Sequence, residues 1–250
     1  MAKRHPYRKK WGQNFLRDPN SITKIINLIG PQKKDVILEI GPGDGALTGA
    51  MHHKAAHVHA VEIDPLLVEY LSKKKYENVT IHESDILDWD LSILNEDFKV
   101  VGNLPYYIST PILFKFLEKM NWQQMIFMFQ KELADRIISK EGSRAYGRIS
   151  VMSQVYCDVR IEFNVSRNVF HPKPDVDSSV LSFYPKEANL PDPNMFSGFI
   201  KQAFAQRRKK LKNNLQDAYE KGLIDNFSDL RPEAISPREY LEIYQMIYFG

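Results

Sequence analysis

The strongest constraint on the fold is the alternation of two kinds of segment along residues 21–139. Short apolar segments have the length of buried strands, and the segments between them carry apolar residues at helical spacing. Such alternation is typical of a mostly parallel sheet with helices on both faces, so the sequence predicts an α/β fold. The expected strands are residues 35–40, 57–63, 79–82, 98–102 and 124–129, and the expected helices are 21–29, 46–54, 65–75, 111–120 and 131–139.

The pattern changes after residue 150. Residues 151–163 and 178–184 are rich in strand-forming side chains and are expected to close the sheet as an antiparallel pair. Three prolines mark residues 185–193 as a linker, and residues 194–221 and 231–249 are expected to be helical. The predicted organisation is a basic tail (1–11), an α/β domain (12–185) and a small helical domain (192–250).

The basic residues are unevenly distributed. The chain has a net charge of +3, yet residues 1–12 and 201–212 hold 11 of its 34 Lys and Arg and no acid, which leaves 23 basic against 31 acidic residues elsewhere. Two concentrated basic segments on an acidic body indicate contact with a polyanion such as RNA, although a solvated tail and a solvated helix face would have the same composition. The candidate RNA contacts in these segments are Lys9, Lys10, Arg207, Arg208, Lys209 and Lys210.

Several classes of protein are disfavoured. No uninterrupted apolar stretch approaches the roughly 20 residues that span a bilayer, and no apolar signal core follows the basic N-terminus. One cysteine, Cys157, permits neither an internal disulfide nor a thiolate zinc site, and the cluster around His52 and His57 lacks the pattern of a zinc-binding helix. We therefore expect a cytoplasmic protein without a metal site.

A glycine-rich turn follows the first expected strand. Gly41 and Gly43 permit a tight turn and close approach of a ligand to the backbone, and the next helix begins where an anionic group would be favoured. The segment also fits the Gly-x-Gly-x-x-Ala pattern of dinucleotide sites. By itself the signal is weak, because an ordinary strand-to-helix turn has the same composition.

Carboxylates lie at the carboxyl ends of the next two expected strands. Glu62 lies 21 residues after Gly41, where an acid can accept hydrogen bonds from both hydroxyls of a ribose. Asp85 could accept from an adenine amino group, with Asp88 and Asp90 as competitors for that role. These features predict a cofactor that contains adenosine, and they do not separate a nicotinamide dinucleotide from S-adenosylmethionine.

The end of the fourth strand distinguishes the two cofactors. An exocyclic adenine nitrogen is a poor nucleophile. The Asn103 side-chain oxygen and the Leu104 carbonyl can accept hydrogen bonds from its two N–H groups and so direct its lone pair toward a methyl donor. Tyr106 can stack on the base. Hydride transfer needs no such set, so the sequence favours S-adenosylmethionine and adenine methylation, although a turn with a packed tyrosine could also look like this.

Several segments in order resemble the rRNA adenine N6,N6-dimethyltransferases, the family that includes the KsgA and Erm enzymes. The resemblance spans nearly the whole chain and rests on residues 12–16 (GQNFL), 39–43 (EIGPG), 61–64 (VEID), 103–110 (NLPYYIST), 145–148 (AYGR) and 169–178 (VFHPKPDVDS). It implies a Rossmann-like class I S-adenosylmethionine-dependent methyltransferase sheet with a small C-terminal α-helical domain that docks RNA.

The resemblance also implies roles for individual residues. Asn14 and Leu16 belong to the loop that lines the methionine end of the cofactor, together with Gly41, Glu62, Asp85 and Asn103. Phe170 resembles the second aromatic that sandwiches the target base opposite Tyr106; as an alternative it is a core phenylalanine. Arg148 is expected either to contact RNA phosphate or to support the site. Tyr107 departs from the family, since many members have Asn there.

Residues 207–209 (RRK) and 213–215 (NNL) resemble the KsgA branch. That branch dimethylates two adjacent adenines in a hairpin near the 3′ end of small-subunit rRNA, so the implied partner is the immature small ribosomal subunit, and the enzyme is expected to act as a monomer. The alternatives are Erm-type methylation of large-subunit rRNA, a non-catalytic assembly or nucleic-acid-binding factor, and a nicotinamide-dependent oxidoreductase.

Overall fold

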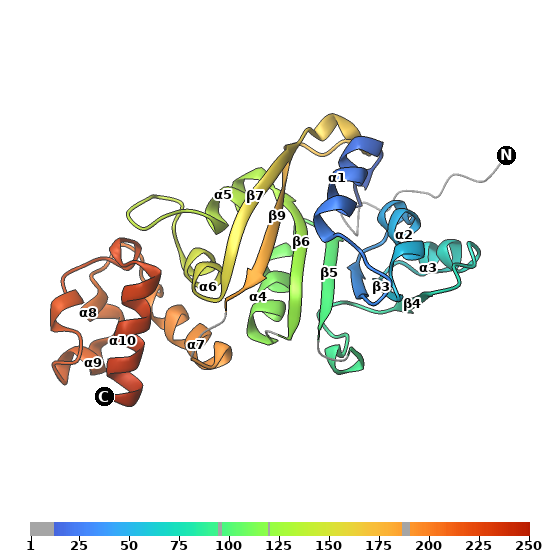
Figure 1. Ribbon diagram of the computed structural model, residues 1–250. Helices are drawn as coiled ribbons and strands as arrows, with labels where there is room; N and C mark the ends of the chain where they lie inside the picture. Colours follow the sequence, from blue (N-terminus) through green and yellow to red (C-terminus); the bar gives the residue numbers. More distant parts are fainter. Residues whose placement is uncertain (1–12, 95–96, 120, 187–190) are drawn as a thin grey trace. The chain divides into compact units, whose positions relative to one another are not determined.

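The computed structural model describes residues 13–94, 97–119, 121–186 and 191–250. Its main feature is a seven-stranded sheet of order β4-β3-β2-β5-β6-β9-β7, in which β2 to β6 pair in parallel and β9 joins β6 antiparallel (Figure 1). A two-stranded sheet pairs β1 with β8. The strands are β1 (Phe15–Leu16), β2 (Val36–Ile40), β3 (His57–Glu62), β4 (Val79–Glu83), β5 (Phe98–Asn103), β6 (Trp122–Gln130), β7 (Cys157–Val165), β8 (Phe170–His171) and β9 (Ser178–Pro185).

Two helices begin at residues with clear capping roles. The Asp18 carboxylate accepts from the Ser21 backbone N–H at the start of α1, and Ser236 and Glu239 form a capping box at the start of α10. The α-helices are α1 (Pro19–Ile29), α2 (Ala46–Met51), α3 (Pro65–Ser72), α4 (Ser109–Lys119), α5 (Lys131–Ile137), α6 (Arg148–Tyr156), α7 (Pro193–Ala203), α8 (Leu211–Asn214), α9 (Gln216–Glu220) and α10 (Pro237–Phe249). Short 3₁₀ segments are η2 (His52–Lys54), η3 (Leu91–Ile93), η4 (Arg167–Val169), η5 (Asp225–Phe227) and η6 (Pro232–Ala234).

The order of the strands locates a ligand-binding edge. Successive strands run outward from β2 through β3 to β4, and the chain then returns to the other side of β2 with β5. The carboxyl ends of β2 and β5 therefore flank a topological switch point, where open α/β sheets bind their ligands. The predicted fold class is confirmed, and all five expected parallel strands lie in this sheet.

The chain forms two compact units. One contains the described residues up to 116 together with 121–134 and 160–184, and the other contains the described parts of 117–120, 135–159 and 185–250. Residues 135–159 thus group with the C-terminal helices, whereas the predicted organisation placed them in the α/β domain. The domain boundaries stay a prediction. None of the described helices is long and apolar enough to cross a membrane.

One expected strand is partly wrong. Residues 151–156 belong to helix α6, and the strand starts only at Cys157. Seven of the nine residues of α6 are buried, so this helix has no polar face and lacks amphipathic spacing. The valines and tyrosine of α6 give it the composition of a strand, and the spacing of apolar residues cannot separate a fully buried helix from a buried strand.

The expectation of continuous helix from 194 to 221 is also wrong. Helix α7 ends at Ala203, and the basic run 207–210 lies in turns before α8 rather than on a helix face. The buried Asn214 side chain stabilises this break: its Nδ2 donates to the Ala203 carbonyl at 2.7 Å, and its Oδ1 accepts from the Gln206 backbone N–H at 3.1 Å. The expected linker is consistent with the gap between β9 and α7, although residues 187–190 lie outside the described residues.

Candidate active site

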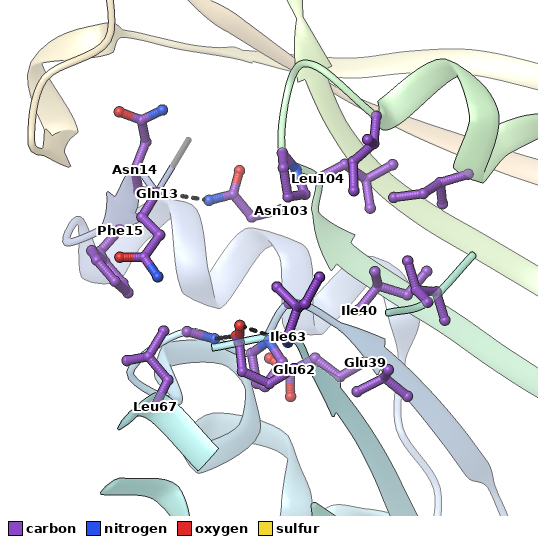
Figure 2. Close-up of a pocket in the computed structure, with 18 of the residues that line it drawn as sticks. Gln13, Asn14, Phe15, Glu39, Ile40, Glu62, Ile63, Leu67, Asn103 and Leu104 are labelled. Carbon is purple, nitrogen blue, oxygen red and sulfur yellow. Dashed lines mark hydrogen bonds between the residues drawn. The ribbon is translucent and has the colours of Figure 1, made fainter. Parts of the chain in front are cut away.

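A pocket lies at the carboxyl ends of the parallel strands, within the unit that holds the sheet. It is lined by four groups of residues: segment 13–16, the glycine turn after β2, the ends of β3 and β4, and residues 103–108 after β5 (Figure 2). All seven predicted cofactor residues line this pocket: Asn14, Leu16, Gly41, Gly43, Glu62, Asp85 and Asn103. Of the predicted catalytic residues, Asn103, Leu104 and Tyr106 line it as well.

The glycine turn has a backbone that other residues rarely adopt. Gly41 and Gly43 have φ angles of +63° and +60°. A Cβ at Gly43 would lie 2.9 Å from a ring carbon of Phe15, whereas a Cβ at Gly41 would meet no atom within 4 Å. The turn therefore presses against segment 13–16 at Gly43 and presents open backbone at Gly41, where a ligand can approach closely.

Glu62 connects two strand ends. Its buried carboxylate accepts hydrogen bonds from the backbone N–H groups of Gly43 (3.1 Å), Ile63 (3.0 Å) and Asp64 (3.0 Å). Burial raises the pKa of Glu62 and the three N–H donors oppose that rise. A carboxylate has about four acceptor sites, so about one is left to accept from a ligand hydroxyl.

The structure separates the three candidate aspartates after β4. Asp85 lines the pocket, and its Oδ1 accepts from the Leu87 backbone N–H at 2.9 Å. Asp88 is exposed and Asp90 accepts from the Ser92 N–H at 2.9 Å as the cap of η3, and neither lines the pocket. Asp85 is therefore the aspartate positioned to contact a ligand there.

Asn103 is oriented by the N-terminal segment. Its Nδ2 donates to the Asn14 carbonyl at 2.9 Å, so the side-chain oxygen is the acceptor available on the pocket side (Figure 2). The Leu104 N–H donates to the Met128 carbonyl at 3.4 Å, on the neighbouring strand β6. Asn103 and Leu104 both line the pocket, and the adenine-amino interpretation requires the Asn103 amide oxygen and the Leu104 carbonyl as its two acceptors.

The two tyrosines that follow differ in their surroundings. They are the central residues of a turn in which the Ile108 N–H donates to the Pro105 carbonyl at 3.2 Å. The Tyr106 hydroxyl is hydrogen-bonded to Ser178 Oγ at 2.8 Å, and its ring is half-buried. Tyr107 is 56% exposed and also lines the pocket.

Segment 13–17 is held at the pocket by a hydrogen bond and an ion pair that the sequence alone did not indicate. Gln13 Nε2 donates to Asp64 Oδ2 at 2.8 Å, and Arg17 forms an ion pair with Asp44 at 2.5 Å. Asp64 is fully buried and also caps helix α3. A carboxylate directly after a strand and before a proline was the only signal for this role.

Glu39 is a second residue that sequence reasoning missed. It lies on β2 at 1% exposure, lines the pocket, and accepts from Thr48 Oγ1 at 2.6 Å. Burial raises the pKa of Glu39 to about 7, against the hydrogen bond from Thr48. The available signal was an acid inside an otherwise apolar strand.

The raised pKa of Glu39 predicts a pH-dependent stability. The folded chain holds this proton more tightly than the unfolded chain, so the contribution is fully present below pH 4.5 and is lost as the pH rises to about 7. In urea denaturation at several pH values, Glu39→Gln should equal the wild type at low pH and exceed it by at most about 3 kcal/mol above pH 7. Glu77→Gln, at an exposed glutamate, is the control; a Glu39→Gln advantage independent of pH would contradict the prediction.

Phe170 is not brought to the pocket. It is 4% exposed, pairs with Leu16 across β1 and β8, and belongs to a hydrophobic cluster with Leu16, Ile26 and Val165. In this placement Phe170 packs in the hydrophobic core, and its role opposite Tyr106 stays a prediction. An aromatic side chain serves both roles, so sequence did not distinguish them.

The predicted RNA contacts also differ in their surroundings. Lys9 and Lys10 lie outside the described residues. Arg148 is half-buried and donates to Ser197 Oγ at 2.7 Å within the C-terminal unit, which is a supporting contact. Arg207 donates to the Tyr146 carbonyl at 2.7 Å, and Lys210 pairs with Asp229 at 2.9 Å. The side chains of Arg208 and Lys209 are exposed and make no hydrogen bond or ion pair within the described residues.

Histidines on β3 and β4 contact one another. His59 Nδ1 lies 3.0 Å from His82 Nε2, and burial, followed by the neighbouring His57 and His82, lowers the pKa of His59 to about 4. Across the described part of the chain, no group of three or more His, Cys, Asp or Glu is arranged to hold a metal ion.

Comparisons with known proteins place this pocket in a family context. The model of a family described as "Ribosomal RNA adenine dimethylase" matches residues 4–248. A protein of Chlorobium phaeobacteroides is 40% identical over 95% of this chain and 92% of its own length, and one of Coxiella burnetii is 38% identical over 98% and 99%; both are named "Ribosomal RNA small subunit methyltransferase A". A dimethyladenosine transferase from Plasmodium falciparum shares the fold with a TM-score of 0.80 at 24% identity, over 92% of this chain and 95% of that one. The 23S rRNA methyltransferase ErmE shares it with a TM-score of 0.73 at 24% identity, over 93% and 99%.

Proposed function

Since this chain belongs to the ribosomal RNA adenine dimethylase family, we propose that it dimethylates the N6 amino groups of two adjacent adenines in a hairpin near the 3′ end of small-subunit rRNA. The observation that carries the proposal is the pair of acceptors formed by Asn103 and Leu104 at the end of β5, beside the Tyr106 ring. The substrate is the immature small ribosomal subunit, and the enzyme acts as a monomer in the cytoplasm during ribosome biogenesis.

The residues of the pocket fit S-adenosylmethionine as the methyl donor. The open backbone at Gly41 gives room for close approach, Glu62 retains an acceptor site for a ribose hydroxyl, and Asp85 can accept from the adenine amino group. Asn14 and Leu16 line the same pocket from the N-terminal side, where the methionine end would lie. When bound, this cofactor supplies a methyl group activated by a sulfonium.

The residues after β5 explain how a weak nucleophile can react. The Asn103 Oδ1 and the Leu104 carbonyl accept hydrogen bonds from the two N6–H groups. These bonds turn the nitrogen lone pair toward the methyl donor and stabilise the positive charge that develops on N6. Tyr106 stacks on the base, with its ring held by Ser178. The methylated nitrogen then loses a proton to water, so no general base is needed. The target adenine must leave its stack, which favours a loop position.

Methyl transfer to isolated ribosomal subunits tests the proposal. Unmethylated small subunits and, in parallel, large-subunit rRNA are incubated with S-adenosylmethionine, and dimethyladenosine is located by mass spectrometry. We expect product at adjacent loop adenines of the small-subunit RNA. Product only in large-subunit RNA would support Erm-type activity, for which the ErmE likeness shows the fold alone. Cofactor binding without product in either RNA would support a non-catalytic assembly factor, and binding of a nicotinamide dinucleotide instead would support an oxidoreductase.

The basic run 207–210 gives a second prediction, about RNA binding. Arg208→Ala with Lys209→Ala should weaken binding to the rRNA hairpin about tenfold at low salt and reduce the slope of log affinity against log salt by about 1.5, because two phosphate contacts are lost. Fluorescence anisotropy over a salt series measures both. Lys34→Ala with Lys54→Ala removes the same charge from exposed positions of the other unit and is the control. An equal loss of slope in both double variants would show a general charge effect instead of a contact.

A further inference from the structure

Two adjacent tyrosines follow the acceptor pair, and of the two only the Tyr106 hydroxyl has a hydrogen-bond partner among the described residues. Tyr106 and Tyr107 occupy the centre of the turn closed by the Ile108 N–H and the Pro105 carbonyl. The hydroxyl of Tyr106 is hydrogen-bonded to Ser178, and Ser178 is the first residue of β9. Tyr106 is thus directed toward the β6–β9 side of the sheet.

Tyr107 lines the pocket together with Asp85, which follows β4, and Glu62, which ends β3. The sheet order places β3 and β4 on the far side of β2 from β6 and β9. The Tyr107 pKa is raised first by burial and then by the negative charges of Asp85 and Glu62, which agrees with a ring near these two carboxylates.

The ring of Tyr107 also offers aromatic surface that a ligand could cover. It is 56% exposed, whereas Phe15, also in the pocket lining, is 7% exposed and lies where a Cβ of Gly43 would be. Phe170, which the resemblance suggested as a second aromatic, is 4% exposed in the hydrophobic cluster. An exposed aromatic ring beside two carboxylates suits a flat, hydrogen-bonding nucleoside.

We propose that Tyr107 is a cofactor-binding residue that packs on the adenosine part of S-adenosylmethionine, while Tyr106 contacts the target base. The inference rests on the proposed function, because it takes Glu62 and Asp85 as the ribose and adenine partners. It assigns the two neighbouring tyrosines to different ligands. Tyr107 sets affinity for the methyl donor and contributes little to RNA binding.

Isothermal titration without RNA tests the assignment with two probes, S-adenosylhomocysteine and 5′-methylthioadenosine, which lacks the amino-acid end. Tyr107→Ala should weaken both about tenfold, corresponding to about 1.4 kcal/mol, because both carry adenosine. Tyr107→Phe should bind within about twofold of wild type, since the ring is kept. Tyr70→Ala, at a tyrosine of α3 that is 45% exposed and outside the pocket lining, is the matched control and should leave both affinities unchanged.

Each outcome decides the assignment. Equal affinities in wild type and Tyr107→Ala would overturn it, as would a loss confined to the KM for rRNA, which would make Tyr107 an RNA contact. A wild type that binds both probes but methylates no rRNA would overturn the proposed function and leave the Tyr107 comparison valid. A wild type that binds neither probe would overturn the cofactor assignment on which both depend.

Discussion

Asn103→Ala should lower kcat for methyl transfer to small-subunit rRNA about 10³-fold, because one of the two acceptors that orient the adenine amino group is lost. The affinity for S-adenosylhomocysteine should fall far less. Asn103 also anchors the Asn14 carbonyl, but Gln13 and Arg17 fasten the same segment independently. Single-turnover kinetics with isolated small subunits measures the rate, and titration measures the affinity.

Asn103→Asp separates the two roles of this side chain. The carboxylate keeps an acceptor for the amino protons but cannot donate to the Asn14 carbonyl. We expect a methyl-transfer rate between those of the wild type and Asn103→Ala, and a cofactor affinity like that of Asn103→Ala, since both variants lose this hydrogen bond. Asn20→Ala, at an exposed asparagine of α1, is the control. A rate for Asn103→Ala within tenfold of the wild type would be incompatible with the proposed role.

Glu62→Ala should reduce the affinity for S-adenosylhomocysteine about 100-fold, the effect of losing a charged hydrogen bond. It should also lower the free energy of unfolding by about 3 kcal/mol, because the N–H groups of Gly43, Ile63 and Asp64 lose their acceptor. Titration and urea denaturation measure the two effects. Since Glu62 joins the turn after β2 to the end of β3, the variant changes both the ligand contact and the pocket wall.

Two further variants separate those contributions. Glu62→Gln keeps one acceptor oxygen, so most of the stability should return while cofactor affinity stays low. Glu83→Ala removes an exposed glutamate that pairs with Glu62 in the register of β3 and β4, and it should change neither quantity. Unchanged cofactor affinity in Glu62→Ala would rule out the ribose contact even if the protein were destabilised.

The parts of the site that were predictable depend on local chemistry. Positive φ at Gly41 and Gly43 requires glycine, and polar residues at the ends of parallel strands meet at one edge of the sheet. Glu62, Asp85 and Asn103 were predictable for this reason. Asp85 could not be separated from Asp88 and Asp90 by sequence, because a shift of a few residues along a loop decides which carboxylate faces the pocket.

The parts that were not predictable depend on tertiary contacts. The end of α7 is fixed by the side chain of Asn214, eleven residues after Ala203, and no local pattern at residue 204 indicates it. Helix α6 is buried nearly all round, so its sequence has strand-like composition. The burial of Phe170 and the exposure of Tyr107 likewise depend on which ring the core covers.

The contacts of segment 13–17 have a practical consequence for making this protein. Gln13 and Asn14 line the pocket, and the Asn14 carbonyl accepts from Asn103, so a shortened chain should retain both residues. A fusion partner placed after helix α10 follows residues of the C-terminal unit, which contribute none of the pocket lining.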